Sequence, residues 1–144
     1  GKLLISDHVL YKPAKLTKEE AEYMKSHTAK GCEIMKMMKD LQTPEYHRVS
    51  MEICLYHHER YDGRGYPEGL KGDEIPISAQ IVSVVDAYHA LISERVYKRS
   101  YSREDAYYMI LGGECGIFSP KIMECFRMSR KEMEEIDTDM EEDA

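Results

Sequence analysis

The chain has 144 residues with a formal net charge of −7, and 42% of its residues are apolar. This length is that of about one domain with a core of its own. No apolar run approaches the roughly eighteen residues that a membrane span needs. We therefore expect a soluble domain. Its four cysteines are widely spaced and form no CxxC pair, so we expect free thiols in a reducing cytoplasm. No stripe of basic residues with interleaved aromatic residues suggests a nucleic-acid duplex as its partner.

The negative charge is concentrated at the C-terminal end of the sequence. Residues 131–144 hold eight acidic side chains and one basic side chain, Lys131, so this segment alone carries a charge of −7. Segments of this kind are usually solvated and do not join the core. We therefore predict a domain over residues 1–128 and an acidic tail over residues 129–144.

Two capped helical stretches are predicted in the first half of the chain. Thr17 and Glu20 form a capping box, and the residues after it recur at helical spacing: Ala21, Met24, Thr28, Cys32, Met35 and Met38. Thr43 supplies an N-cap and Pro44 a first helical residue. The second helix is therefore predicted to run from there to about Arg60.

A long irregular loop follows these helices. Residues 61–76 hold four glycines and two prolines, which excludes regular secondary structure. A loop of this length is more often functional than a plain connection. The apolar segment after it is predicted to begin at a cap, Ser78. Its β-branched residues would also suit a buried strand, but its length and apolar spacing favour a buried helix.

The remaining sequence predicts two shorter helices. Ser102 with Asp105 caps one of them, which ends at the glycines of residues 112–113. Ser119 and Pro120 begin the other. The fold class is therefore predicted to be all-α, a helical bundle with one long, glycine-rich loop.

Two adjacent histidines, His57 and His58, stand at the end of a predicted helix beside the long loop. Successive helical residues point about 100° apart, so both rings cannot serve one ion by the usual i, i+4 geometry. They could reach two neighbouring ions, or one could be a ligand and the other a supporting group. The alternative is that one ring packs in the core while the other is solvated.

Asp86 is a carboxylate inside an otherwise apolar helix, where an unpaired charge would cost several kcal/mol. A salt bridge to an arginine would explain it, and so would a metal ion. His27 lies beside the apolar stripe of its helix, where a hydrogen-bonded, half-buried ring is the alternative to a ligand. One aspartate and three histidines together suit Fe, Mn or Zn better than Ca or Mg.

A basic cluster, Arg95, Lys98 and Arg99, follows the helix that carries Asp86. Cations close to a metal ligand are what a phosphodiester substrate needs. The alternative is that these residues only complement the dipole at a helix C-terminus.

The segment His57–Pro67, HHERYDGRGYP, resembles the HHExxDGxGYP signature of the HD-GYP family almost residue for residue. The downstream segment GLKGDEIPISAQIVSVVDAYHAL is similar to the family's continuation. The upstream segment GKLLISDHVLYKPAKLTKEEAEYMKSH is similar to the stretch that follows its HDxGK motif. The resemblance covers about residues 1–127.

The resemblance implies a helical HD-superfamily domain with a bi- or trinuclear centre of divalent metal, most often iron or manganese. It implies metal-dependent hydrolysis of cyclic di-GMP to pGpG, and often onward to GMP. The positions that match the family's functional residues are His27, His57, His58 and Asp86 as metal ligands, Lys2 as a catalytic lysine near the scissile phosphate, and Tyr66, Gly63, Gly65, Arg95 and Lys98 in substrate binding.

Two departures from the family pattern affect these expectations. The family's His-Asp pair would lie immediately before Gly1, so we expect this chain to represent the C-terminal portion of the bundle, to bind metal weakly or not at all, and to be inactive alone. The apolar surface left by missing helices would favour a homodimer. His89 stands where many members have an aspartate, and Val96 replaces a common proline.

The leading hypothesis is therefore a cyclic di-GMP phosphodiesterase domain that is active in its intact parent protein. One alternative is a catalytically inactive module that binds nucleotide or a signalling partner such as a diguanylate cyclase domain. Another retains hydrolysis but acts on a different cyclic dinucleotide.

Overall fold

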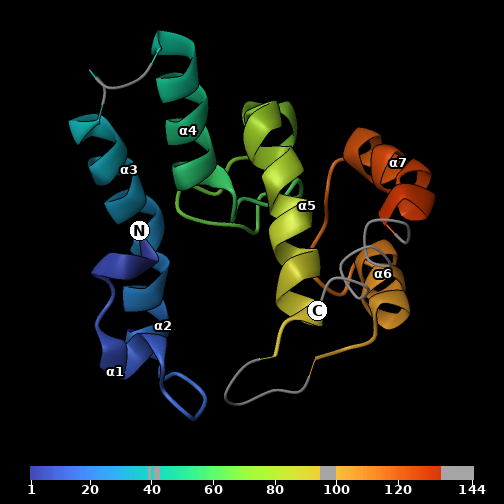
Figure 1. Ribbon diagram of the computed structural model, residues 1–144, viewed down its shortest axis with the longest axis horizontal. Coiled ribbons are helices and arrows are strands. Elements are labelled where there is room, and N and C mark those ends of the chain that lie inside the picture. The colour runs from blue at the N-terminus through green and yellow to red at the C-terminus, as the bar shows by residue number, and fades with distance from the viewer. Residues whose placement is uncertain (39, 41–42, 95–99, 134–144) are drawn as a thin grey trace, which may run out of the picture.

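The computed structural model describes residues 1–38, 40, 43–94 and 100–133, which form helices and no strand (Figure 1). The all-α prediction is therefore confirmed. None of the described helices is long and apolar enough to cross a membrane. In chain order the elements are η1 (Lys2–Leu4), α1 (Asp7–Leu10), α2 (Lys18–Lys25), α3 (His27–Met37), α4 (Pro44–Tyr56), η3 (Gly72–Glu74), α5 (Ile77–Ile92), α6 (Arg103–Leu111) and α7 (Pro120–Met128).

The helices pack in the order of the chain. Helix α3 contacts α2 and α4, α4 contacts α5, and α5 contacts both α6 and α7. Figure 1 shows α5 between α4 on one side and the α6–α7 pair on the other. The long loop connects α4 to α5, so it joins the two halves of the arrangement. This loop is irregular as predicted, apart from the short turn η3 and one isolated bridge between Asp62 and Lys71.

The apolar core lies in the second half of the chain. Helix α5 contributes Val84, Ala87 and Leu91, and these pack against residues of α6, α7 and the segment between them: Ala106, Tyr107, Ile110, Phe118, Ile122 and Phe126. The rings of Tyr107 and Phe126 are stacked, with centroids 5.2 Å apart. This burial is what places α5, the helix of Asp86, against its neighbours.

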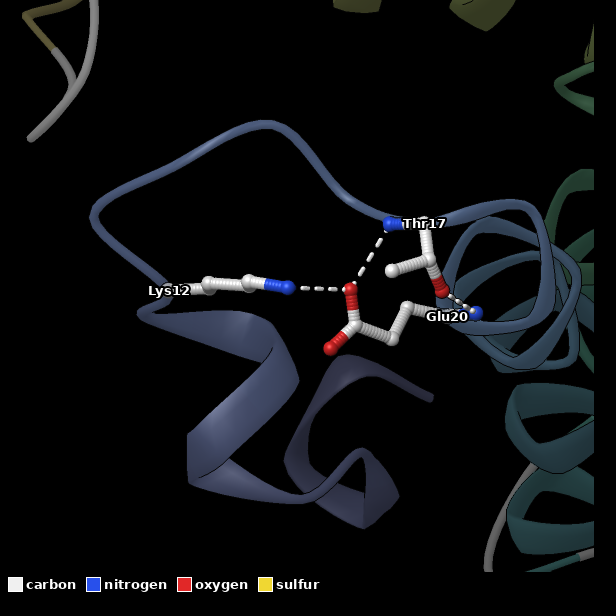
Figure 2. Close-up of polar contacts among 3 residues, drawn as sticks. All are labelled: Lys12, Thr17 and Glu20. Carbon is white, nitrogen blue, oxygen red and sulfur yellow. Dashed lines mark hydrogen bonds and ion pairs between the residues drawn. The ribbon is translucent and has the colours of Figure 1, made fainter.

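Helix α2 begins at the predicted capping box. The Thr17 hydroxyl accepts from the Glu20 amide at 3.2 Å, and one Glu20 carboxylate oxygen accepts from the Thr17 amide at 2.7 Å. That same oxygen accepts from the Lys12 ammonium at 2.6 Å (Figure 2). A single carboxylate thus joins both ends of the segment between Lys12 and Thr17.

Three helix boundaries differ from the prediction. The predicted helical stretch 18–38 is divided at Ser26, whose hydroxyl donates to the Tyr23 carbonyl at 2.6 Å and competes with the helical pattern. Helix α4 ends at Tyr56, and not near Arg60. Helix α5 begins at Ile77, so Ser78 is not its cap; its hydroxyl instead donates to a Glu52 carboxylate oxygen at 2.7 Å.

The caps of the last two helices follow the prediction. The Ser102 hydroxyl accepts from the Asp105 amide at 3.0 Å, and α6 ends at Gly112. Ser119 precedes Pro120 at the start of α7. The predicted boundary between residues 128 and 129 stays a prediction, because most of the acidic tail, residues 134–144, lies outside the described residues.

Candidate metal centre

Three histidines from two parts of the chain meet beside the long loop. His27 is the first residue of α3, His57 caps the C-terminus of α4, and His58 follows it. One ring nitrogen from each lies within 4.8 Å of the others, close enough to hold one metal ion. The adjacent histidines do not diverge by a helical step as predicted, because α4 ends at Tyr56 and both residues lie in a turn. Their ring centroids are only 4.1 Å apart.

Two backbone carbonyls orient this cluster. His27 Nδ1 lies 2.8 Å from the Met24 carbonyl oxygen, and His57 Nδ1 lies 2.8 Å from the Ile53 carbonyl oxygen. A carbonyl only accepts, so each Nδ1 carries the proton and each Nε2 keeps its lone pair. The two Nε2 atoms face one another at 3.4 Å. Two lone pairs at this distance repel each other unless a cation lies beside them, and a divalent metal meets that requirement.

Burial keeps the three rings in the form that binds metal. It lowers the pKa of His27 and of His57, and in both cases it outweighs the backbone carbonyl that favours the charged ring. Burial, followed by the charges of His57 and His27, lowers the pKa of His58 to about 2. The rings are therefore neutral near pH 7, and a neutral imidazole is the ligand form.

Asp86 faces this region from α5 and is half-buried. Its negative charge raises the pKa of His57, although burial lowers that pKa by more. Among the described residues, no arginine or other group forms an ion pair or hydrogen bond with this carboxylate, so the predicted alternative of a salt bridge is not found there. Asp86 lies outside the tight three-histidine cluster, and its role as a ligand stays a prediction.

A pocket of about 480 Å³ opens beside the histidines. Its walls include His27, His58, Tyr66 and two lysines, Lys2 and Lys12. The ring of Tyr66 stacks on that of His58, with centroids 4.7 Å apart and planes at 24°. Burial raises the pKa of Tyr66 to about 12, so its hydroxyl remains a hydrogen-bond donor at neutral pH.

The two lysines of this pocket differ in their partners. Lys12 is held by Glu20, as described above. The charge of Lys2 contributes to the lowered pKa of His27 and His57, so it lies close enough to influence both rings. Within the described part of the chain, no acidic side chain pairs with Lys2, and its ammonium is available for an anion in the pocket.

The loop that carries Tyr66 is fixed by two charged residues that the sequence analysis did not assign. Glu59 is only 2% exposed, and its Oε1 accepts from the amides of Glu68 and Gly69 at 2.8 and 3.1 Å. Arg60 donates to the Cys115 carbonyl at 3.1 Å and to the Ser83 hydroxyl at 2.7 Å. Both residues directly follow the histidine pair within the signature, and this place in the sequence could have marked them as positioning residues.

The two signature glycines have structural reasons to be glycine. A Cβ atom on Gly65 would lie 2.4 Å from the backbone of residues 59 and 60, so only glycine lets the loop approach the histidine turn. Gly63 has a φ of 81°, a conformation that residues with a side chain rarely adopt. Substrate binding by either glycine stays a prediction.

Other predicted site residues lie apart from this centre. Arg95, Val96, Lys98 and Arg99 lie outside the described residues. His89 is exposed on α5 and forms a hydrogen bond with the Ser93 hydroxyl at 3.2 Å. It does not join the three-histidine cluster.

Comparison with known proteins gives a family match and several relatives. Residues 1–114 match the family described as HD domain. The chain is 42% identical over 127 residues (88% of this chain, 26% of the relative) to a protein of Vibrio cholerae named cyclic di-GMP phosphodiesterase. It is 41% identical over 136 residues (94% and 36%) to a Thermotoga maritima protein of the same name.

A relative with a different printed substrate is also similar. The chain is 37% identical over 124 residues (86% of this chain, 23% of the relative) to a Vibrio cholerae protein named 3'3'-cGAMP-specific phosphodiesterase 2. The chain spans between about a quarter and about a third of the length of the curated relatives that it matches.

Proposed function

Because this chain belongs to the HD domain family, and to its HD-GYP branch, we propose that it is a metal-dependent phosphodiesterase domain that hydrolyses cyclic di-GMP to pGpG and GMP. The observation that carries the proposal is the pair of imidazole Nε2 atoms of His27 and His57, which lie 3.4 Å apart, with His27 on the wall of the pocket. A histidine pair that only stabilised the fold would place a donor opposite an acceptor. Here both nitrogens are acceptors.

His27, His57 and His58 would hold the metal, with Asp86 as a further ligand from α5. Nitrogen and oxygen ligands of this kind suit iron or manganese, in a centre of two or three ions. When bound, such ions activate water for attack on phosphorus and stabilise the negative charge that develops on the phosphate. The carbonyls of Met24 and Ile53 keep two of the ligand rings in the correct tautomer.

Three other residues of the chain would bind and orient the substrate. Lys2 supplies a positive charge to a phosphate oxygen, and we assign it the catalytic role of stabilising that phosphate during the reaction. Tyr66 presents its hydroxyl as a donor while its ring excludes water from one side of His58. A volume of about 480 Å³ is in the range of pockets that bind small ligands. Arg95 and Lys98 are proposed as further phosphate contacts from the resemblance alone.

The proposal is tested with the protein in its natural sequence context, loaded with Mn²⁺ or Fe²⁺ and incubated with cyclic di-GMP. We expect pGpG and then GMP. His57→Ala should abolish product formation and weaken metal binding by at least about tenfold, measured by competition with a chelator. His89→Ala is the matched control, because this exposed histidine contacts Ser93 and should leave both quantities unchanged. A metal-loaded protein that forms neither product would overturn the proposal.

The same assay separates the alternatives. Similarity to a 3'3'-cGAMP-specific phosphodiesterase makes that dinucleotide the competing substrate, and faster cleavage of it would reassign the specificity. Binding of cyclic di-GMP without cleavage would favour the inactive binding module. The inactivity of these 144 residues alone, a diguanylate cyclase partner and a homodimer all stay predictions.

A further inference from the structure

A much smaller cavity is lined by Glu59, the residue after the histidine pair, and shares no lining residue with the large pocket. It has a volume of about 10 Å³, and it is enclosed by the start of the long loop, by α5 and by residues 117–119. This is about the smallest volume that can hold one water molecule. Its lining includes two polar side chains from different elements, Glu59 from the loop and Gln80 from α5.

Each of these side chains has one buried oxygen atom without a hydrogen-bond partner among the described residues. Glu59 Oε1 accepts from two loop amides, but Glu59 Oε2 accepts from nothing. Gln80 Nε2 donates to the Ile75 carbonyl at 2.7 Å, and this bond identifies the other amide atom, Oε1, as the acceptor that is left over. The two residues are only 2% and 8% exposed, so bulk solvent does not satisfy either atom.

With Glu59 ionised, the two oxygen atoms cannot satisfy one another, because a carboxylate oxygen and an amide oxygen both accept. The nearby guanidinium of Arg60 already donates to the Cys115 carbonyl and the Ser83 hydroxyl. The cavity therefore needs a small group with two donors. A water molecule has two, whereas a metal cation would require several more oxygen ligands than these two unpartnered atoms.

We propose that this cavity is a binding site for a single structural water, which donates one hydrogen bond to Glu59 Oε2 and one to Gln80 Oε1. The water joins the loop to α5, and both residues are linked to the metal centre through the chain, since Glu59 follows His58 and Gln80 lies on the helix of Asp86. Glu59 and Gln80 are thus positioning residues. Through the bound water they fix the position of the histidine turn relative to the helix that carries Asp86.

A high-resolution crystal structure of the chain, with a second crystal soaked in a thallium(I) salt, tests the site directly. We expect one density peak within hydrogen-bonding distance of both oxygen atoms and no anomalous signal at that position in the soaked crystal. An anomalous thallium peak would overturn the water in favour of a monovalent cation. An empty cavity, or direct contact between the two oxygen atoms through a shared proton, would overturn the site itself.

A double-mutant cycle tests the bridge in solution. Glu59→Gln keeps the size of the side chain, and Gln80→Met keeps its length while removing the acceptor together with the bond to the Ile75 carbonyl, a loss that the cycle cancels. If one water links the two residues, the effect of the double variant on the unfolding equilibrium constant should differ from the product of the single effects by at least about threefold. Glu52→Gln combined with Gln80→Met is the control, because Glu52 bonds to Ser78 and does not line the cavity. Multiplicative effects in the first pair, equal to the control, would contradict the bridge.

Discussion

The two ends of this molecule are held together in different ways. The N-terminal region, residues 1–56, has short helices, and no residue of α1, α2 or α4 is buried. The C-terminal region, residues 77–128, contains the continuous apolar core of α5, α6 and α7. Yet His27 lies in the N-terminal region, and His57 and His58 directly follow its last helix. The three proposed metal ligands thus lie within or next to the region with the least buried apolar surface.

The difference shows how the site can be rigid without lying in the core. The histidine turn is attached to the C-terminal region by polar contacts from the loop. Arg60 is the main link, since it reaches Cys115 and Ser83 and lies over the ring of Phe118 at 5.1 Å. Apolar packing therefore stabilises one region, and directional hydrogen bonds position the other against it. Four measurements would test this division between the two regions.

The largest effect is expected from the core. Phe126→Ala removes a ring that stacks on Tyr107 and is 7% exposed, and it should lower the free energy of unfolding by about 3–5 kcal/mol. Met128→Ala on the same helix is the control, because Met128 is 72% exposed and should cost less than about 0.5 kcal/mol. Urea unfolding followed by circular dichroism measures both. Equal losses would show that α7 does not carry the core.

The second-largest loss of stability is expected from removing the link between the two regions. Arg60→Met keeps most of the side chain but removes the hydrogen bonds from Arg60 to the Cys115 carbonyl and the Ser83 hydroxyl, at a cost of about 1–3 kcal/mol. Arg64→Met in the same loop removes only an exposed ion pair with Asp62 and should cost less than about 0.5 kcal/mol. If the two variants unfold at the same urea concentration, the loop is not held by Arg60.

A smaller effect, confined to acid, should come from the histidines. In metal-free protein, burial lowers the pKa of His58 from about 6.5 in the unfolded chain to about 2. Below about pH 6.5 the unfolded chain therefore binds the additional proton, and the free energy of unfolding falls by about 1.4 kcal/mol per pH unit for this group. Between pH 7 and pH 5 the loss amounts to about 2 kcal/mol, because only the part below the unfolded pKa contributes fully.

The variant His58→Gln isolates this contribution. Urea unfolding between pH 7 and pH 5 should show a slope smaller by about one proton than that of the wild type. His89→Gln is the control, because His89 is exposed and lies outside the three-histidine cluster, and this variant should keep the slope of the wild type. An unchanged slope in His58→Gln would mean that His58 titrates normally in the folded protein.

The smallest effect is expected at a helix start. Thr17→Ala removes the hydroxyl that accepts from the Glu20 amide, which should destabilise α2 locally by about 1 kcal/mol. Thr17→Ser should restore it. Because α2 buries no side chain, hydrogen exchange of its amides should accelerate while global urea unfolding changes little. A full loss in global stability would show that the two regions unfold as one unit.

Most of the fold was predictable because local rules specify it. The capping box at Thr17, the cap at Ser102 and the proline at 120 each acted within one helical turn. The break at Ser26 was missed because the apolar spacing continues through it. Ser78 was assigned as a cap, but its true partner, Glu52, lies on another helix.

The site was predictable to the same extent. The signature identified His57 and His58, but their spacing suggested divergence, since the end of α4 at Tyr56 is not encoded by a glycine or proline. Contact between His27 and this pair spans 30 residues of sequence and depends on how α3 packs on α4. The signature marks the place of Glu59 and Arg60 in the sequence, but it does not predict the backbone groups that they contact.

The Glu20 carboxylate that holds both Lys12 and Thr17 has a consequence for engineering. It holds the segment at both ends, so the residues between Lys12 and Thr17 can be substituted without removing these two contacts. Leu16, within this segment, lines the large pocket. A fluorescent label at Ala14 would therefore sit close to arriving ligand while the histidines stay undisturbed, which makes this segment the natural place to build a reporter of pocket occupancy.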